Sequence, residues 1–207
     1  MDTKFTPSLN FSGRASIIKE ADKICRNVNS NFPHVSPYLA WNQYHQPMEH
    51  YRAFISYWSK LDELRAATRY TDTAYDYYDV LINKLKVLKS ANCGDLSDIV
   101  YLKCKNKNFD DVKLVQLGGV SDITGKKVKY DHVAVEFKHN GKSILIDPLF
   151  GFADFVQNGF LKYKGIFKRF INGYNENFRL TLFDTDTVRI QPYDLEKLTL
   201  KHKDLIG

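Results

Sequence analysis

Cysteine is scarce in this sequence of 207 residues, which contains only Cys25, Cys93 and Cys104. Their spacing matches no metal-binding pattern, and so few thiols cannot form a disulfide framework, so neither a metal site nor a disulfide-stapled fold is indicated. Along one helix, Cys93 and Cys104 would lie about 16 Å apart, which is too far for a bridge. A reducing compartment therefore suits the chain.

Long apolar runs and a secretory signal are also missing. No stretch reaches the length of about 18 apolar residues that a membrane-spanning helix requires. Residues 1–8 lack the basic and apolar blocks of a secretory signal. We expect no membrane span, and either a cytoplasmic location or export without a recognisable signal peptide, including delivery into a host cell.

The chain does contain enough apolar and aromatic residues for a full core. Hydrophobic residues make up 43% and aromatic residues 14% of the sequence, which predicts one domain over residues 1–207. The pattern predicts an α+β fold, with a mainly helical part in residues 1–90 and a helix followed by an antiparallel sheet in residues 91–207. Helices are expected at residues 13–29, 47–70 and 72–89, a loop at 30–47, and strands near 112–117, 128–138, 142–147, 178–183 and 187–191.

An Asn-Gly turn fixes the geometry of one predicted hairpin. Asn140 and Gly141 lie between two apolar runs, and both tolerate the positive φ angles of a two-residue turn. With these residues as the loop, Ala134 faces Asp147, and His132 is the diagonal neighbour of Asp147 on the same face, about 7 to 8 Å away by backbone. The carboxylate is then within reach of the imidazole ring. A register slip of one residue would place the two on opposite faces.

Cys93 begins a further predicted helix. Asn92 before it is a suitable N-cap, and acidic residues follow in the first two turns, where they suit the helix dipole. A thiol at a helix N-terminus is favoured as the thiolate, and its backbone N–H can form half of an oxyanion hole. The apolar stripe of this helix consists of Leu96, Ile99, Val100 and Cys104.

Each of these three residues also has an ordinary structural explanation. A single cysteine is often a small buried hydrophobe, a strand histidine is often an interior hydrogen-bonded residue, and an aspartate before Pro148 commonly begins a turn. Their order and their elements favour instead a nucleophile, its base and the residue that orients the base. We therefore predict that Cys93, His132 and Asp147 form a catalytic triad.

Three short motifs carry a resemblance to known enzymes, namely Asn92-Cys93-Gly94-Asp95, Asp131-His132-Val133-Ala134-Val135 and Ile146-Asp147-Pro148. Over about residues 85–152 the chain resembles the transglutaminase-like branch of the papain-like cysteine enzymes. This resemblance implies a transglutaminase-like core, in which the nucleophile helix packs on the antiparallel sheet, and no cofactor.

Two other groups are similar in this region. The separations between the three residues resemble those of arylamine N-acetyltransferases, but the Arg-Gly-Gly that precedes the cysteine in that family is replaced by Ser90-Ala91-Asn92. Small bacterial toxins and effectors built on this core, which act on host proteins as proteases or glutamine deamidases, are also similar. The resemblance thus selects a chemistry rather than a substrate.

The resemblance also suggests residues that would assist the triad. Papain-like enzymes often use an amide side chain upstream of the cysteine to complete the oxyanion hole, so Asn92, Gln43 and Gln46 are candidates. Trp41 and Tyr130 are candidates for substrate binding. The structural alternative for residues 37–46 is an aromatic loop that Trp41 anchors to the core.

Basic and aromatic residues alternate in residues 160–170, and the chain carries a net charge of +6. Such a pattern can bind single-stranded nucleic acid, but no RNP-like or helix-turn-helix signature accompanies it. We therefore expect an amphipathic element with aromatic side chains inside and lysines in solvent, and no nucleic-acid partner. Beside a catalytic site, the strip would line the substrate groove and suit an acidic protein. The histidines predicted to lie at the surface are His34, His45, His50, His139 and His202.

These features predict a cysteine hydrolase that acts on amide bonds of a protein substrate through a thioester, as a protease or a glutamine deamidase. An acyltransferase or transglutaminase would use the same three residues and is an alternative. A non-catalytic protein-binding module that keeps the core is another, because a fold does not determine a function.

Overall fold

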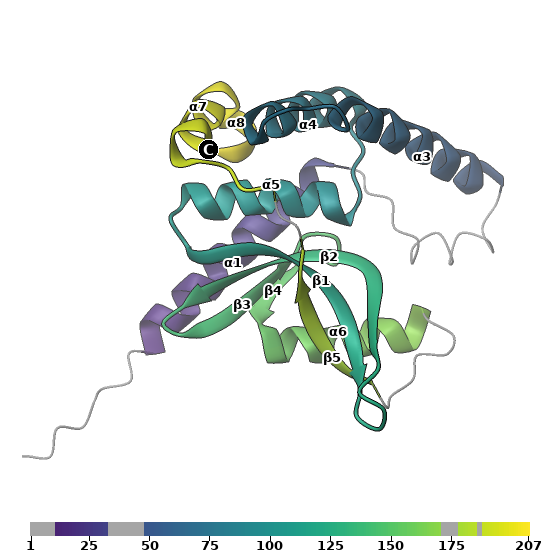
Figure 1. The fold of residues 1–207 in the computed structure, drawn as a ribbon, viewed down its shortest axis with the longest axis vertical. Helices are drawn as coiled ribbons and strands as arrows, with labels where there is room; N and C mark the ends of the chain where they lie inside the picture. Colours follow the sequence, from purple (N-terminus) through teal and green to yellow (C-terminus); the bar gives the residue numbers. More distant parts are fainter. Residues whose placement is uncertain (1–10, 33–47, 171–177, 186–187) are drawn as a thin grey trace, which may run out of the picture.

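The computed structural model describes residues 11–32, 48–170, 178–185 and 188–207, and within them the architecture is α+β (Figure 1). The helices are α1 (Phe11–Asn31), α3 (Met48–Thr68), α4 (Ala74–Leu88), α5 (Cys93–Asn106), α6 (Val156–Phe170), α7 (Pro192–Lys201) and α8 (Lys203–Ile206). The strands are β1 (Asp110–Ser121), β2 (Lys127–His139), β3 (Lys142–Asp147), β4 (Phe152–Phe155) and β5 (Phe178–Asp184). In these parts of the chain, no helix combines the length and the apolar character needed to cross a membrane.

The strands form one antiparallel sheet in the order β4-β3-β2-β1-β5. Helices α1 and α5 lie over one face of this sheet and α6 lies over the other (Figure 1). Helices α4, α7 and α8 pack outside α5 and form a further layer. Strand β2 in the middle of the sheet is therefore covered on both faces, as its two-sided apolar pattern predicts.

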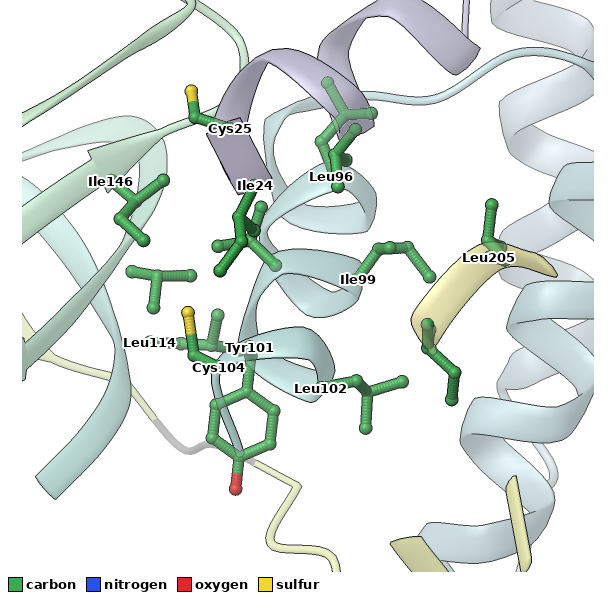
Figure 2. Close-up of a cluster of buried hydrophobic side chains, with 14 of the residues drawn as sticks. Ile24, Cys25, Leu96, Ile99, Tyr101, Leu102, Cys104, Leu114, Ile146 and Leu205 are labelled. Atoms are coloured by element: carbon green, nitrogen blue, oxygen red, sulfur yellow. The ribbon is translucent and has the colours of Figure 1, made fainter. Parts of the chain in front are cut away.

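Helix α5 lies at the centre of the larger core cluster. Its side chains Leu96, Ile99 and Leu102 are completely buried. They pack between α1 and the sheet on one side and the C-terminal helix α8 on the other (Figure 2). Burial of side chains of this size contributes about 1.5 to 3 kcal/mol each. This packing holds α5, and with it the first residue of the helix, in a fixed place against the sheet.

A smaller core cluster fills the opposite face of the sheet. It consists of buried side chains from the strands, together with Tyr163 of α6. Tyr163 is completely buried, although lysines precede and follow it in the sequence. Its members are Val115, Leu117, Ala134, Leu145, Phe152, Tyr163 and Leu180.

The predicted helices and the hairpin are confirmed, with small changes at their ends. Helix α1 continues to Asn31, so it enters the loop that was predicted for residues 30–47, and residues 33–47 lie outside the described part of the chain. The prediction of a strand near 187–191 is wrong for residues 188–191, which have no regular secondary structure. The apolar residues of this segment suggested a strand, but Ile190 is its one buried side chain. Pro192 then begins helix α7. Strand β4 and helices α6, α7 and α8 were not predicted.

Candidate active site

The β2–β3 hairpin has the predicted register. His139 pairs with Lys142 and Val135 pairs with Ile146, while Asn140 and Gly141 have φ angles of 50° and 71°. These positive angles at both loop residues are those of the two-residue turn that Asn-Gly favours. The register places the side chains of residues 132 and 147 on the same face of the sheet, as expected.

His132 and Asp147 are in direct contact. The Nε2 atom of His132 lies 2.6 Å from Oδ2 of Asp147, and both side chains are completely buried. Because a carboxylate only accepts hydrogen bonds, Nε2 must carry the hydrogen and donate it. The other ring nitrogen, Nδ1, is thus the one that can exchange a proton with a reacting group.

The Asp147 carboxylate accepts hydrogen bonds at both of its oxygens. The backbone N–H of Phe150 donates to Oδ1 at 3.0 Å, and the hydroxyl of Tyr163 donates to Oδ2 at 2.5 Å. Together with the His132 ring, these groups give the buried charge three donors. A buried carboxylate needs such donors, because an unpaired one would be strongly destabilising.

Cys93 is the first residue of α5 and is partly exposed. Asn92 before it forms a capping box, in which its side chain accepts the Asp95 N–H and its own N–H donates to the Asp95 carboxylate. One turn into the helix, the Ser97 hydroxyl donates to the carbonyl of Val133 at 3.0 Å, next to His132 in the chain. The cap and this contact fix the start of α5 beside the middle of β2.

The electrostatics of His132 link it to both other residues. Burial lowers the pKa of its ring, but the Asp147 charge and hydrogen bonds with Asp147 and Cys93 raise it more strongly, to about 10. The imidazole is therefore protonated at neutral pH and places a positive charge beside the sulfur. Burial strongly raises the pKa of the Cys25 and Cys104 thiols.

A β-bulge lies at His132. Gln116 of β1 pairs with Val133 and Gly118 pairs with Lys129, so residues 130–132 of β2 lie opposite one residue of β1. The Gln116 side chain donates to the carbonyl of Tyr130 at 2.9 Å, which satisfies a backbone group in this bulge. Bulges re-aim side chains near functional sites. Sequence analysis did not find Gln116, because a bulge has no clear signal in the apolar pattern.

Helix α1 holds the other side of the site. The Cys25 thiol donates to the backbone carbonyl of Asp147 at 3.1 Å, and the Asn29 side chain donates to the carbonyl of Pro148 at 2.5 Å. These contacts fix the end of β3 from a helix more than a hundred residues away in the sequence. Neither residue was predicted, and nothing local in the sequence marks them.

The remaining predicted site residues divide into two groups. Asn92 and Tyr130 lie in the described structure, where Asn92 caps α5 and the Tyr130 side chain is partly buried against the smaller core cluster. Gln43, Gln46 and Trp41 lie outside the described residues.

The basic and aromatic strip lies in α6. Phe160 is half-buried and Tyr163 is buried, whereas Lys162 and Lys164 are exposed. This is the amphipathic arrangement that was expected for the first part of the strip. The side chains of residues 167–170 lie outside the described part.

His202 is a correction to the sequence analysis, because it is not a surface residue. It is buried, and its Nε2 lies 2.7 Å from Oδ1 of Asp79 in α4. The prediction considered carboxylates on neighbouring strands only, whereas here a helix provides the partner.

No protein-family model matches the chain, and the comparison with curated proteins finds no match either. Among the described residues, no group of three or more His, Cys, Asp or Glu side chains could hold a metal ion. The interpretation of the site therefore rests on its geometry and chemistry.

Proposed function

We propose that this protein is a cysteine hydrolase that acts on amide bonds of a protein substrate through a thioester intermediate, as a protease or a glutamine deamidase. The observation that carries the proposal is the contact of a partly exposed thiol, at a helix N-terminus, with a buried imidazole that a buried carboxylate orients. These contacts support the proposal, because covalent catalysis by cysteine uses a nucleophile, a base and a group that orients the base.

In the proposed acylation step, the Cys93 sulfur attacks the carbonyl carbon of the amide. A C–S bond forms while the carbonyl oxygen gains negative charge, and the backbone N–H of Cys93 is one donor that can stabilise this charge, because the first N–H groups of a helix lack intrahelical acceptors. When the oxyanion collapses, the C–N bond breaks and His132 gives a proton to the departing amine or ammonia. The product is a thioester on Cys93.

In the proposed deacylation step, His132 takes a proton from water as the water oxygen attacks the thioester carbon. The C–S bond then breaks, and the carboxylic acid product leaves with the sulfur restored. Asp147 keeps Nε2 protonated throughout, so that Nδ1 remains the nitrogen that accepts the proton from water and donates the proton to the leaving group.

A second oxyanion donor is part of the proposal. Of the predicted amides, Asn92 is the one in the described residues, and its Oδ1 accepts the Asp95 N–H. The Nδ2 of the same side chain can donate to a bound substrate. An Asn92→Asp variant would keep an N-cap acceptor and remove that amide donor, which separates the two roles.

We further propose that the core is transglutaminase-like. Three features support this: the thiol begins a helix packed on the sheet, the histidine lies on a central strand, and the aspartate ends the next strand. The same core serves proteolysis, deamidation and amine transfer, because these differ only in the bond that is attacked and in the nucleophile that resolves the thioester.

The test is the rate of iodoacetamide labelling of each cysteine against pH, read by peptide mass spectrometry in the native protein and in His132→Ala. We expect Cys93 to label much faster than Cys104 below pH about 7, and to lose this advantage without His132. Cys104 is an internal control, because it is buried on the same helix. Equal and slow labelling of both cysteines would refute the enzyme and leave the non-catalytic binding module.

The reaction type is decided by three products measured on one protein substrate, casein. New N-termini indicate a protease, released ammonia indicates a deamidase, and incorporation of an added primary amine indicates a transglutaminase. Whichever product the native protein forms should vanish in Cys93→Ala and persist in Cys104→Ala.

A further inference from the structure

Tyr163 is a buried tyrosine that contacts two members of the proposed triad. Its hydroxyl donates to Oδ2 of Asp147 at 2.5 Å, and its ring meets the His132 ring edge-on, with centroids 5.8 Å apart. Phe150 and Phe152 pack against the Tyr163 ring, with ring centroids 6.1 and 5.3 Å from its own. The side chain is completely buried, so its orientation is fixed by packing on all sides.

Two donors thus share one carboxylate oxygen. The His132 Nε2–H and the Tyr163 hydroxyl both bond Oδ2, while Oδ1 accepts a backbone N–H. Because Tyr163 takes up part of the negative charge density on Oδ2, less of it is available to the imidazolium.

We propose that Tyr163 is a positioning residue of the reaction, which fixes the Asp147 carboxylate and moderates its attraction for the protonated His132 ring. The inference rests on the proposed function, since it assigns Tyr163 a role in that same triad. Moderation is useful because His132 must also release its proton to a leaving amine, and a ring held too strongly as the imidazolium would be a poor acid.

The hydroxyl can perform this role over the whole working range of pH. Burial, and then the neighbouring Asp147 charge, raise the pKa of Tyr163 well above its usual value, so the group remains a neutral donor. The other titratable groups that face His132 and its carboxylate are Cys93 from α5 and Cys25 from α1.

The experiment is an NMR titration of the His132 ring, between about pH 6 and about pH 11, in the native protein, Tyr163→Phe and Tyr78→Phe. Tyr78 is the matched control, because it is also completely buried and its hydroxyl donates to a backbone carbonyl, that of Val188, outside the site. We expect the midpoint of His132 to rise by about one pH unit in Tyr163→Phe and to stay unchanged in Tyr78→Phe. An unchanged or lower midpoint in Tyr163→Phe overturns the proposal.

A second substitution covers the case in which Tyr163→Phe does not fold. Replacement of Tyr163 by 3-fluorotyrosine keeps the hydroxyl and makes it a stronger donor, so the midpoint of His132 should fall. A midpoint that does not fall overturns the proposal.

The two proposals fail in different ways. Labelling of Cys93 by iodoacetamide tests the proposed enzyme, whereas the His132 titration reads the effect of Tyr163 with no substrate. Fast labelling of Cys93 with an unmoved titration removes only the role of Tyr163, and slow labelling removes the enzyme itself.

Discussion

Replacing Asp147 by Asn removes the negative charge on which the proposed triad depends while changing the shape of the side chain little. The amide oxygen can occupy the place of Oδ2 and still accept from His132 and Tyr163. The amide nitrogen then occupies the place of Oδ1, where it meets the Phe150 N–H, so that two donors face each other. Because the shape is kept, the variant should fold, but with two donors that lack an acceptor and an imidazole without its counterion.

The size of the effect follows from these losses. An unsatisfied buried donor costs about 1 to 3 kcal/mol, and breaking a buried ion pair from one side costs about 3 to 5 kcal/mol in total. Without the carboxylate, the main influence that raises the pKa of His132 is lost while burial still lowers it, so a smaller fraction of the ring is protonated at pH 7. We expect the free energy of unfolding to fall by about 3 to 5 kcal/mol, and iodoacetamide labelling of Cys93 near pH 6 to slow by about a hundredfold.

Urea unfolding and labelling kinetics measure the two effects in one preparation. Asp79→Asn is the matched control, because Asp79 also bonds a buried histidine, His202, at 2.7 Å. It should lose stability without slowing the labelling of Cys93. Native labelling rates in Asp147→Asn, with the ring of His132 still charged at neutral pH, would refute the proposed role of Asp147.

Further predictions concern stability, each measured by urea unfolding. Asn92→Ala should destabilise the protein by about 1 kcal/mol, because the capping box of α5 is lost. Gly118→Ala should destabilise it by more than about 2 kcal/mol, since the new methyl group would collide with the Phe183 ring and the backbone. Gly165→Ala, in helix α6 with open space around it, should stabilise by up to about 1 kcal/mol. In Cys93→Ala, where no thiol titrates beside the ring, the Asp147 carboxylate still raises the pKa of His132, so the stability contributed by this pair should be present below about pH 6.5 and be lost as the pH rises further; a flat profile in that variant would contradict this.

The part of the site that sequence could predict is the part governed by local rules. The Asn140-Gly141 turn sets the hairpin register, and this register places His132 on the same face as Asp147. The N-cap at Asn92 sets the start of α5 and the place of its thiol. In each case a short stretch of sequence determines the backbone geometry, so no knowledge of distant contacts is needed.

The residues that sequence reasoning missed act over long separations. Cys25 and Asn29 hold the end of β3 from a helix near the start of the chain, and Tyr163 reaches Asp147 from α6, on the opposite side of the sheet from that helix. Their partners depend on how the helices pack, which apolar periodicity does not specify. A buried tyrosine between lysines in α6 was visible only as part of an amphipathic pattern.

The described residues contain two His–Asp pairs in which the histidine is buried, and the contrast between them supports the proposed chemistry. His202 and Asp79 connect the C-terminal helices to α4, and Lys86 and Lys201 accompany them, so this pair has a structural explanation as a network of charges. A buried ion pair is a weak source of stability, and apolar side chains of similar size would often serve as well. The pair formed by His132 and Asp147 lies instead beside a partly exposed thiol, with a tyrosine and a β-bulge that hold it in place. Stability alone does not require that arrangement, whereas the proposed acyl transfer uses the thiol, the imidazole and the carboxylate together.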